Sequence, residues 1–201
     1  VEQTFKKGLP IDAGALLVTD VDGNLEEDLN YQLAQIEKVF FENGCSEFKI
    51  AKDDKEAKDI WFARRNASPA LSVYGSKKLN EDVTVPRAAL PELLERFYAI
   101  ADKYNIKIPC FGHTGDGNVH TNVMVDGKDP EQVKIAYQAI EEVFQATIDL
   151  GGTLSGEHGI GLAKAPYMRM AFTDEEMNLF KSIKKAFDPN NILNPAKMGL
   201  N

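Results

Sequence analysis

The stretch that organises this chain is FGHTGDGNVHTN, residues 111–122. It holds two of the three histidines of the sequence, His113 and His120. An apolar run precedes it from residue 106, and a second, alternating run continues to residue 125. Asp-Gly between two such runs is a strong signal for a β-hairpin, because a type I′ turn needs two residues with positive φ. The sequence therefore predicts a hairpin with its turn at residues 116–117.

A two-residue turn at this point fixes the register of the predicted hairpin. It sets residue 115 against 118, and His113 directly against His120. Opposed residues of an antiparallel pair have Cβ atoms about 5 Å apart and point to the same face of the sheet. Asn118 and Asn122 share that face, because side chains alternate along a strand. We therefore expect a polar face on which two imidazoles can share a metal ion; a hydrogen-bonded histidine pair beside a plain turn is the alternative.

The third histidine lies in a glycine-rich motif, GGTLSGEHGIG, residues 151–161. Such a loop costs conformational entropy unless its backbone must approach another group closely. Glu157 and His158 are neighbours with diverging side chains, so one can bind a metal while the other faces a reacting atom. Glu157 as third ligand gives a His₂-carboxylate set with open positions, which suits zinc, iron(II) or manganese. The alternative is a turn histidine beside a glutamate at a helix cap.

Composition excludes some classes of function. The formal net charge is −8, and no Lys/Arg run is longer than two residues, so the electrostatic footprint of a nucleic-acid-binding protein is missing. Cys45 and Cys110 are far apart and form no CxxC motif, so we expect two small buried thiols in a reducing compartment, with a single disulfide between them as the alternative. No apolar run approaches the roughly 20 residues of a membrane span. We expect a cytoplasmic protein, with peripheral membrane association only through a partner.

Hydrophobic spacing predicts a mixed order of helices and strands. Helices are expected at 30–43, 53–70, 88–104, 130–150 and 174–187, and strands at 15–21, 48–51, 82–85, 106–111 and 118–125. This order indicates an α+β fold in which an antiparallel or mixed sheet is covered by helices, with ferredoxin-like halves and a C-terminal helical segment. A doubly wound nucleotide-binding sheet is disfavoured, because no GxGxxG follows a strand and no GxxxxGK[ST] occurs.

Three motifs taken together resemble a known family. They are HTGDGNVHTN at 113–122, GGTLSGEHGIG at 151–161 and FDPNNILNPAKM at 187–198. The chain is similar, over nearly its whole length, to the C-terminal cap domain of FAD-linked oxidases of the vanillyl-alcohol-oxidase superfamily. Within it, the resemblance is to glycolate oxidase FAD-binding subunits and to D-lactate and D-2-hydroxyglutarate dehydrogenases.

The resemblance implies oxidation of a 2-hydroxy acid to the 2-oxo acid, with hydride transfer to FAD. It implies the metal ligands His113, His120 and Glu157, the catalytic base His158, the substrate-binding residues Arg64 and Asn122, and the cofactor-binding residues Asn194 and Glu157. The expected partners are a small 2-hydroxy acid, the FAD-binding domain of the same protein and an electron-acceptor subunit of iron–sulfur or flavoprotein type.

Two departures from the family accompany this resemblance. Relatives carry an upstream FAD-binding domain that these residues lack, so we expect residues 1–201 to be the cap domain alone, inactive without that domain. Some relatives have a substrate-binding lysine at the position that Asn80 occupies in this sequence. Lys78 is the candidate to replace that lysine here. The alternative function is a freestanding metal-binding or hydrolytic domain that uses His113, His120 and Glu157 without flavin.

Overall fold

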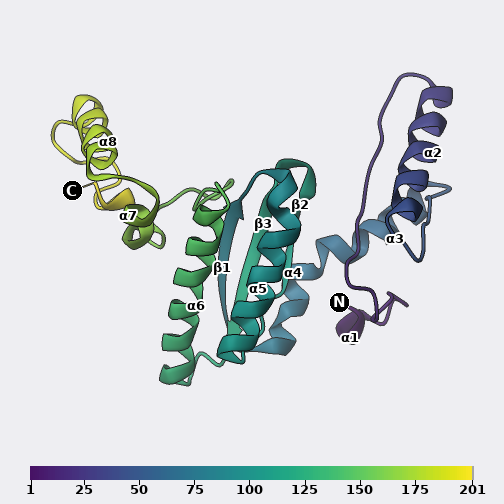
Figure 1. Cartoon of the computed structure of the whole chain (residues 1–201), viewed down its shortest axis with the longest axis horizontal. Coiled ribbons are helices and arrows are strands. Elements are labelled where there is room, and N and C mark those ends of the chain that lie inside the picture. The colour runs from purple at the N-terminus through teal and green to yellow at the C-terminus, as the bar shows by residue number, and fades with distance from the viewer. Residues whose placement is uncertain (201) are drawn as a thin grey trace. The chain divides into compact units, whose positions relative to one another are not determined.

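The computed structural model describes residues 1–200, which form two compact units (Figure 1). One unit runs from Val1 to Ala70 and the other begins at Leu71. No helix among the described residues combines the length and the apolar character that crossing a membrane requires.

The first unit is built from helices. They are α1 at Glu2–Phe5, α2 at Glu26–Glu42, α3 at Asp54–Arg65 and α4 at Ala67–Ala70. α3 begins after Asp53, whose carboxylate accepts the Glu56 N–H at 2.8 Å and so caps the first turn. The single helix predicted for residues 53–70 is thus divided at Asn66, which is the C-cap of α3.

The strands predicted at 15–21 and 48–51 are wrong, because residues 1–70 contain no strand. A run of β-branched and apolar residues forms a strand only where a neighbouring strand pairs with it. Without such a partner, Leu16 and Leu17 are each 56% exposed. Local propensity in this stretch was therefore a poor guide to its structure.

The second unit contains three strands and four helices among its described residues. The strands are β1 at Lys77–Thr84, β2 at Cys110–His113 and β3 at Asn118–Val125, and the helices are α5 at Leu90–Tyr104, α6 at Pro130–Asp149, α7 at Met168–Ala171 and α8 at Asp174–Phe187. Short 3₁₀ turns lie at Leu71–Tyr74, Arg87–Ala89, Thr114–Asp116, Ala165–Tyr167 and Lys197–Gly199.

The three strands form one antiparallel sheet in the order β1-β3-β2. Thr153, after α6, makes an isolated antiparallel bridge with Thr84 on the outer side of β1. The order of a ferredoxin-like unit is thereby completed, with its fourth strand reduced to one bridge. The α+β class is confirmed, although the described residues contain one such unit and not two. The bridge also brings the glycine-rich loop to the edge of β1.

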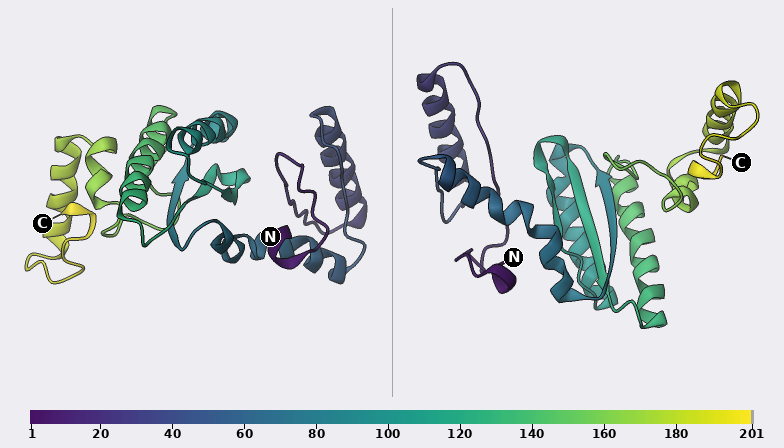
Figure 2. Two further views of the ribbon diagram at one scale, coloured as in Figure 1. Left: turned by 90° about the horizontal axis from the view of Figure 1, so that it is seen from below. Right: turned by 180° about the vertical axis from the view of Figure 1, so that it is seen from behind.

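The two faces of the sheet differ in character. α5 and α6 lie side by side on one face (Figure 2), where Val83, Val119 and Val123 pack against fully buried Phe97 and Phe144. Each buried phenylalanine contributes about 2 kcal/mol. Strand alternation turns the even-numbered residues of β1 and β3 to the opposite face. The helical layer therefore leaves a polar face available for a site.

Helix ends in this unit follow the sequence signals. α6 begins at Pro130, and Asp129 accepts the next two free N–H groups of its first turn. Thr173 caps α8 in a capping box with Glu176. A second, small apolar cluster joins Met168, Met177 and Leu200.

Candidate metal centre

His113 and His120 lie on the polar face, but in a register that differs from the predicted one. His113 pairs with Asn118, and His120 pairs with Phe111. The predicted direct opposition of the two histidines is wrong because the turn has four residues instead of two: Thr114–Asp116 form a 3₁₀ turn that ends at Gly117, with φ of 71°. A register shift of two residues keeps each side chain on its face. The two imidazoles therefore still meet diagonally, with ring centroids 5.4 Å apart.

Glu157 and His158 reach the same face from the glycine-rich loop. Glu157 Oε1 lies 3.4 Å from His120 Nε2 and 3.6 Å from His158 Nε2. The His158 ring stacks on the His120 ring at 5.3 Å. The two motifs, far apart in sequence, thus contribute to one cluster that contains all three histidines of the chain.

The geometry of this cluster fits a divalent ion. One ligand atom each from His113, His120 and Glu157 can be chosen so that all three lie within 4.8 Å of one another. Ligands about 2.1 Å from a tetrahedral ion lie roughly 3.4 Å apart, so only small side-chain movements are needed to close around one. His120 is buried while His113 and Glu157 are exposed, which leaves an open side for water or substrate. The bound metal itself stays a prediction.

Asn122, two residues after His120 on β3, is fully buried. Its Oδ1 accepts from Asn80 Nδ2 at 2.8 Å, and its own Nδ2 donates to the carbonyls of Pro109 and His120, each at 3.1 Å. These bonds engage both ends of the amide and orient the strand that carries His120. The predicted contact of Asn122 with substrate stays a prediction. Asn80, which aligns with the substrate lysine of some relatives, donates a hydrogen bond to Asn122.

Asp82 is a site residue that sequence reasoning missed. It lies directly opposite His120 in the β1–β3 register and is fully buried. Burial, the largest effect, opposes its ionisation, but hydrogen bonds from the N–H of Glu157, from Lys164 and from the N–H of His158 outweigh it and lower its pKa. The available signal was alternation: Val83 and Val85 face the core, so Asp82 must share the face of His120.

Two further predicted residues lie outside this cluster. Arg64 belongs to α3 of the first unit, and its substrate-binding role stays a prediction. Asn194 adopts a positive φ of 46° after α8. It lines a cavity of about 540 Å³ with Ile160 and Gly161, at the C-terminal end of the glycine-rich loop. Its predicted role near a flavin is likewise untested.

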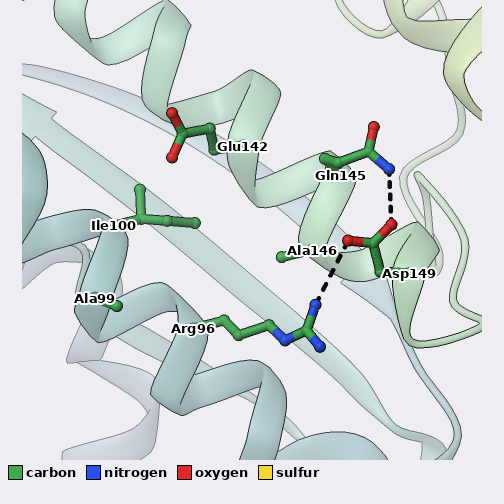
Figure 3. A pocket seen from close by; sticks show the side chains of 7 residues that line it. All are labelled: Arg96, Ala99, Ile100, Glu142, Gln145, Ala146 and Asp149. Carbon is green, nitrogen blue, oxygen red and sulfur yellow. Dashed lines mark hydrogen bonds and ion pairs between the residues drawn. The ribbon is translucent and has the colours of Figure 1, made fainter.

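A second hollow, of about 310 Å³, lies between α5 and α6 (Figure 3). Arg96 and Asp149 form an ion pair at 3.5 Å in its wall, and Gln145 donates to Asp149 at 2.8 Å. The helices that form this hollow cover the apolar face of the sheet. It contains none of the predicted site residues and does not belong to the metal centre.

Comparison with known proteins gives a consistent family. Residues 1–198 match the family described as FAD linked oxidases, C-terminal domain. The chain is 38% identical over 198 residues to the glycolate oxidase subunit GlcD of Bacillus subtilis, covering 98% of this chain and 42% of that protein. It is 32% identical to the D-lactate dehydrogenase of Anaerostipes hadrus, with the same shares covered. It is also 32% identical to the D-2-hydroxyglutarate dehydrogenase of Haemophilus influenzae, covering 91% of this chain and 19% of that protein. The chain thus spans less than half the length of these relatives.

Proposed function

The chain belongs to the family of FAD linked oxidase C-terminal domains, and we propose that it is the substrate- and metal-binding part of a flavin-dependent 2-hydroxy-acid dehydrogenase or oxidase of glycolate or D-lactate type. The observation that carries this proposal is the cluster of His113, His120 and Glu157 with His158 beside it. The printed names of the relatives supply the substrate class.

In this proposal each residue of the cluster has its own task. His113, His120 and Glu157 hold a divalent ion, which supplies a Lewis acid that makes the substrate hydroxyl more acidic. His158 takes the hydroxyl proton; its side chain is 47% exposed, so a substrate can reach it. FAD, held mainly by another domain of the protein, supplies the acceptor for the hydride that leaves the substrate Cα. Arg64 and Asn122 are proposed to orient the substrate, and Asn194 to contact the flavin.

We propose three partners for residues 1–201. They are the small 2-hydroxy acid, the FAD-binding domain of the same protein and an electron-acceptor subunit of iron–sulfur or flavoprotein type. The Bacillus subtilis relative is itself named as a subunit, which supports the third partner. The cytoplasm, with peripheral membrane association through that subunit, remains the proposed location.

The direct test uses the chain loaded with cobalt(II), whose visible spectrum reports its ligands. We expect about one ion per chain and a spectral change on adding glycolate or D-lactate that acetate or propionate, which lack the hydroxyl group, does not reproduce. Glu157→Gln should weaken Co²⁺ binding at least 100-fold, so that the cobalt spectrum appears only at a much higher Co²⁺ concentration. Glu95→Gln, an exposed change on α5, is the matched control and should leave it unaltered. Equal responses to glycolate and acetate would contradict the proposed substrate class.

A further inference from the structure

The Asp82 carboxylate is surrounded by donors from the glycine-rich loop. Its Oδ2 accepts the backbone N–H groups of Gly156, Glu157 and His158 at 3.1, 2.5 and 3.0 Å. Its Oδ1 accepts from Ser155 Oγ at 3.1 Å. Successive N–H groups that converge on one anion form a nest, and charge-assisted hydrogen bonds of this kind are about twice as strong as neutral ones. The loop is therefore folded around this one carboxylate.

Lys164 supplies the charge that balances Asp82. The residue is only 4% exposed. Its ammonium donates to Asp82 Oδ1 and to the Asp82 carbonyl, both at 2.8 Å. It also donates to the Leu154 carbonyl at 2.7 Å. Removal of one partner from a buried ion pair is strongly destabilising, because the other charge stays buried. Asp82 and Lys164 thus join β1 to both ends of the short segment that presents Glu157.

The backbone of Asp82 is fixed by the strand that carries His120. The two residues are Cα partners in the β1–β3 ladder. The loop is also pressed against that sheet at Gly156, where an added Cβ would lie 1.8 Å from Asn118 Nδ2 and 2.5 Å from Thr84 Oγ1. One residue therefore sets the loop position relative to the histidines, and a glycine at 156 permits the approach.

We propose that Asp82, together with Lys164, is the positioning residue of the metal centre: it holds the 155–158 loop so that Glu157 meets the ion bound by His113 and His120. The inference rests on the proposed metal-binding function and adds to it a residue that does not itself touch the ion. Groups that orient metal ligands typically change metal affinity 10- to 100-fold when they are removed.

The test is a double-mutant cycle on the full chain, with the Co²⁺ dissociation constant as the readout. We expect Asp82→Asn to weaken Co²⁺ binding 10- to 100-fold in the wild-type background. In the Glu157→Gln background the same change should have almost no further effect, because Asp82 acts through Glu157. An equal loss in both backgrounds would show a merely structural role and would overturn the proposal.

Amide hydrogen exchange separates this proposal from the metal assignment. Asp82→Asn should speed exchange at residues 156–158 while leaving α5 and α6 protected, with or without metal. Unchanged exchange in this loop would overturn the anchoring role. Failure of wild-type chain to bind Co²⁺, with faster loop exchange in Asp82→Asn, would instead reject the metal centre and retain Asp82 as the loop anchor.

Two further variants control this experiment. Ser155→Ala removes one donor to Asp82, so it should weaken Co²⁺ binding and speed loop exchange as Asp82→Asn does, but to a smaller extent. It provides the test if Asp82→Asn does not fold. Asp126 also accepts hydrogen bonds from a serine hydroxyl and a backbone N–H, those of Ser76 at 2.8 Å and of Lys128 at 3.0 Å. It follows the C-terminal end of β3, away from the histidines. Asp126→Asn should leave Co²⁺ affinity and loop exchange unchanged; a loss equal to that of Asp82→Asn would count against a specific role.

Discussion

The two halves of the candidate site are held in different ways. His113 and His120 stand on paired strands, where the backbone ladder fixes their positions. Glu157 and His158 stand on a loop without regular structure, which depends on Asp82 for its fold. A ladder distributes its stability over many bonds, whereas residues 155–158 of the loop are held to the sheet mainly by one buried carboxylate and one buried ammonium. Single substitutions should therefore damage the loop half more selectively than the hairpin half.

The largest expected effect on stability comes from replacing Asp82, the residue that anchors the glycine-rich loop. Asp82→Asn should lower the free energy of unfolding by about 3 kcal/mol, because it leaves the Lys164 ammonium buried without its main counter-charge. Glu81 Oε2, 3.8 Å from Lys164 Nζ, softens this loss. Chemical denaturation of the metal-free chain measures it. A cost no larger than that of Asp126→Asn would show that the loop does not depend on this pair.

The next effect is on the close approach of the loop to the sheet. Gly156→Ala should cost about 2 kcal/mol and weaken metal binding, because its Cβ has no room beside Asn118 and Thr84. The Glu157 carboxylate would be displaced while the hairpin remains intact. Denaturation and a Co²⁺ titration measure the two consequences. Unaltered Co²⁺ affinity would indicate that the ion does not require the loop in this position.

A smaller effect on metal binding is expected from a change in the hairpin turn. Gly117 has a positive φ, and a Cβ there would lie 2.0 Å from the Val85 carbonyl oxygen. Gly117→Ala should therefore cost about 2–3 kcal/mol of folding stability, because the clash is with backbone, but metal binding should be retained because the ladder holds both histidines. Gly115→Ala is the matched control, since no atom lies within 4 Å of its added Cβ. Loss of metal binding in Gly117→Ala would show that the hairpin is no more robust than the loop.

Much of the hairpin half follows from the sequence. A period of two residues places His113 and His120 on one face under either register, so the conclusion survived a wrong turn length. The turn type itself was misjudged, because an Asp-Gly pair fits the end of a four-residue 3₁₀ connection as well as a type I′ turn. Gly117 takes the left-handed conformation in the turn that forms.

The loop half was less accessible from the sequence. Its glycines correctly indicate close backbone approach, which occurs at Gly152 and at Gly156. The link from Asp82 to Glu157 spans 75 residues, and the one from Asp82 to Lys164 spans 82. Local periodicity carries no information on such pairings. The same limit explains the wrong strands at 15–21 and 48–51, where propensity was high but no partner strand exists within residues 1–70.

The central claim is that the two halves form one metal centre. The most direct measurement is a Co²⁺ titration of the wild-type chain beside one variant from each half, His120→Ala and Glu157→Gln, with Glu95→Gln as control. The account predicts about one ion per chain in wild type and control, and at least a 100-fold loss of affinity in both site variants. Loss in His120→Ala alone would contradict it, because the ion would then be bound by the hairpin without the loop.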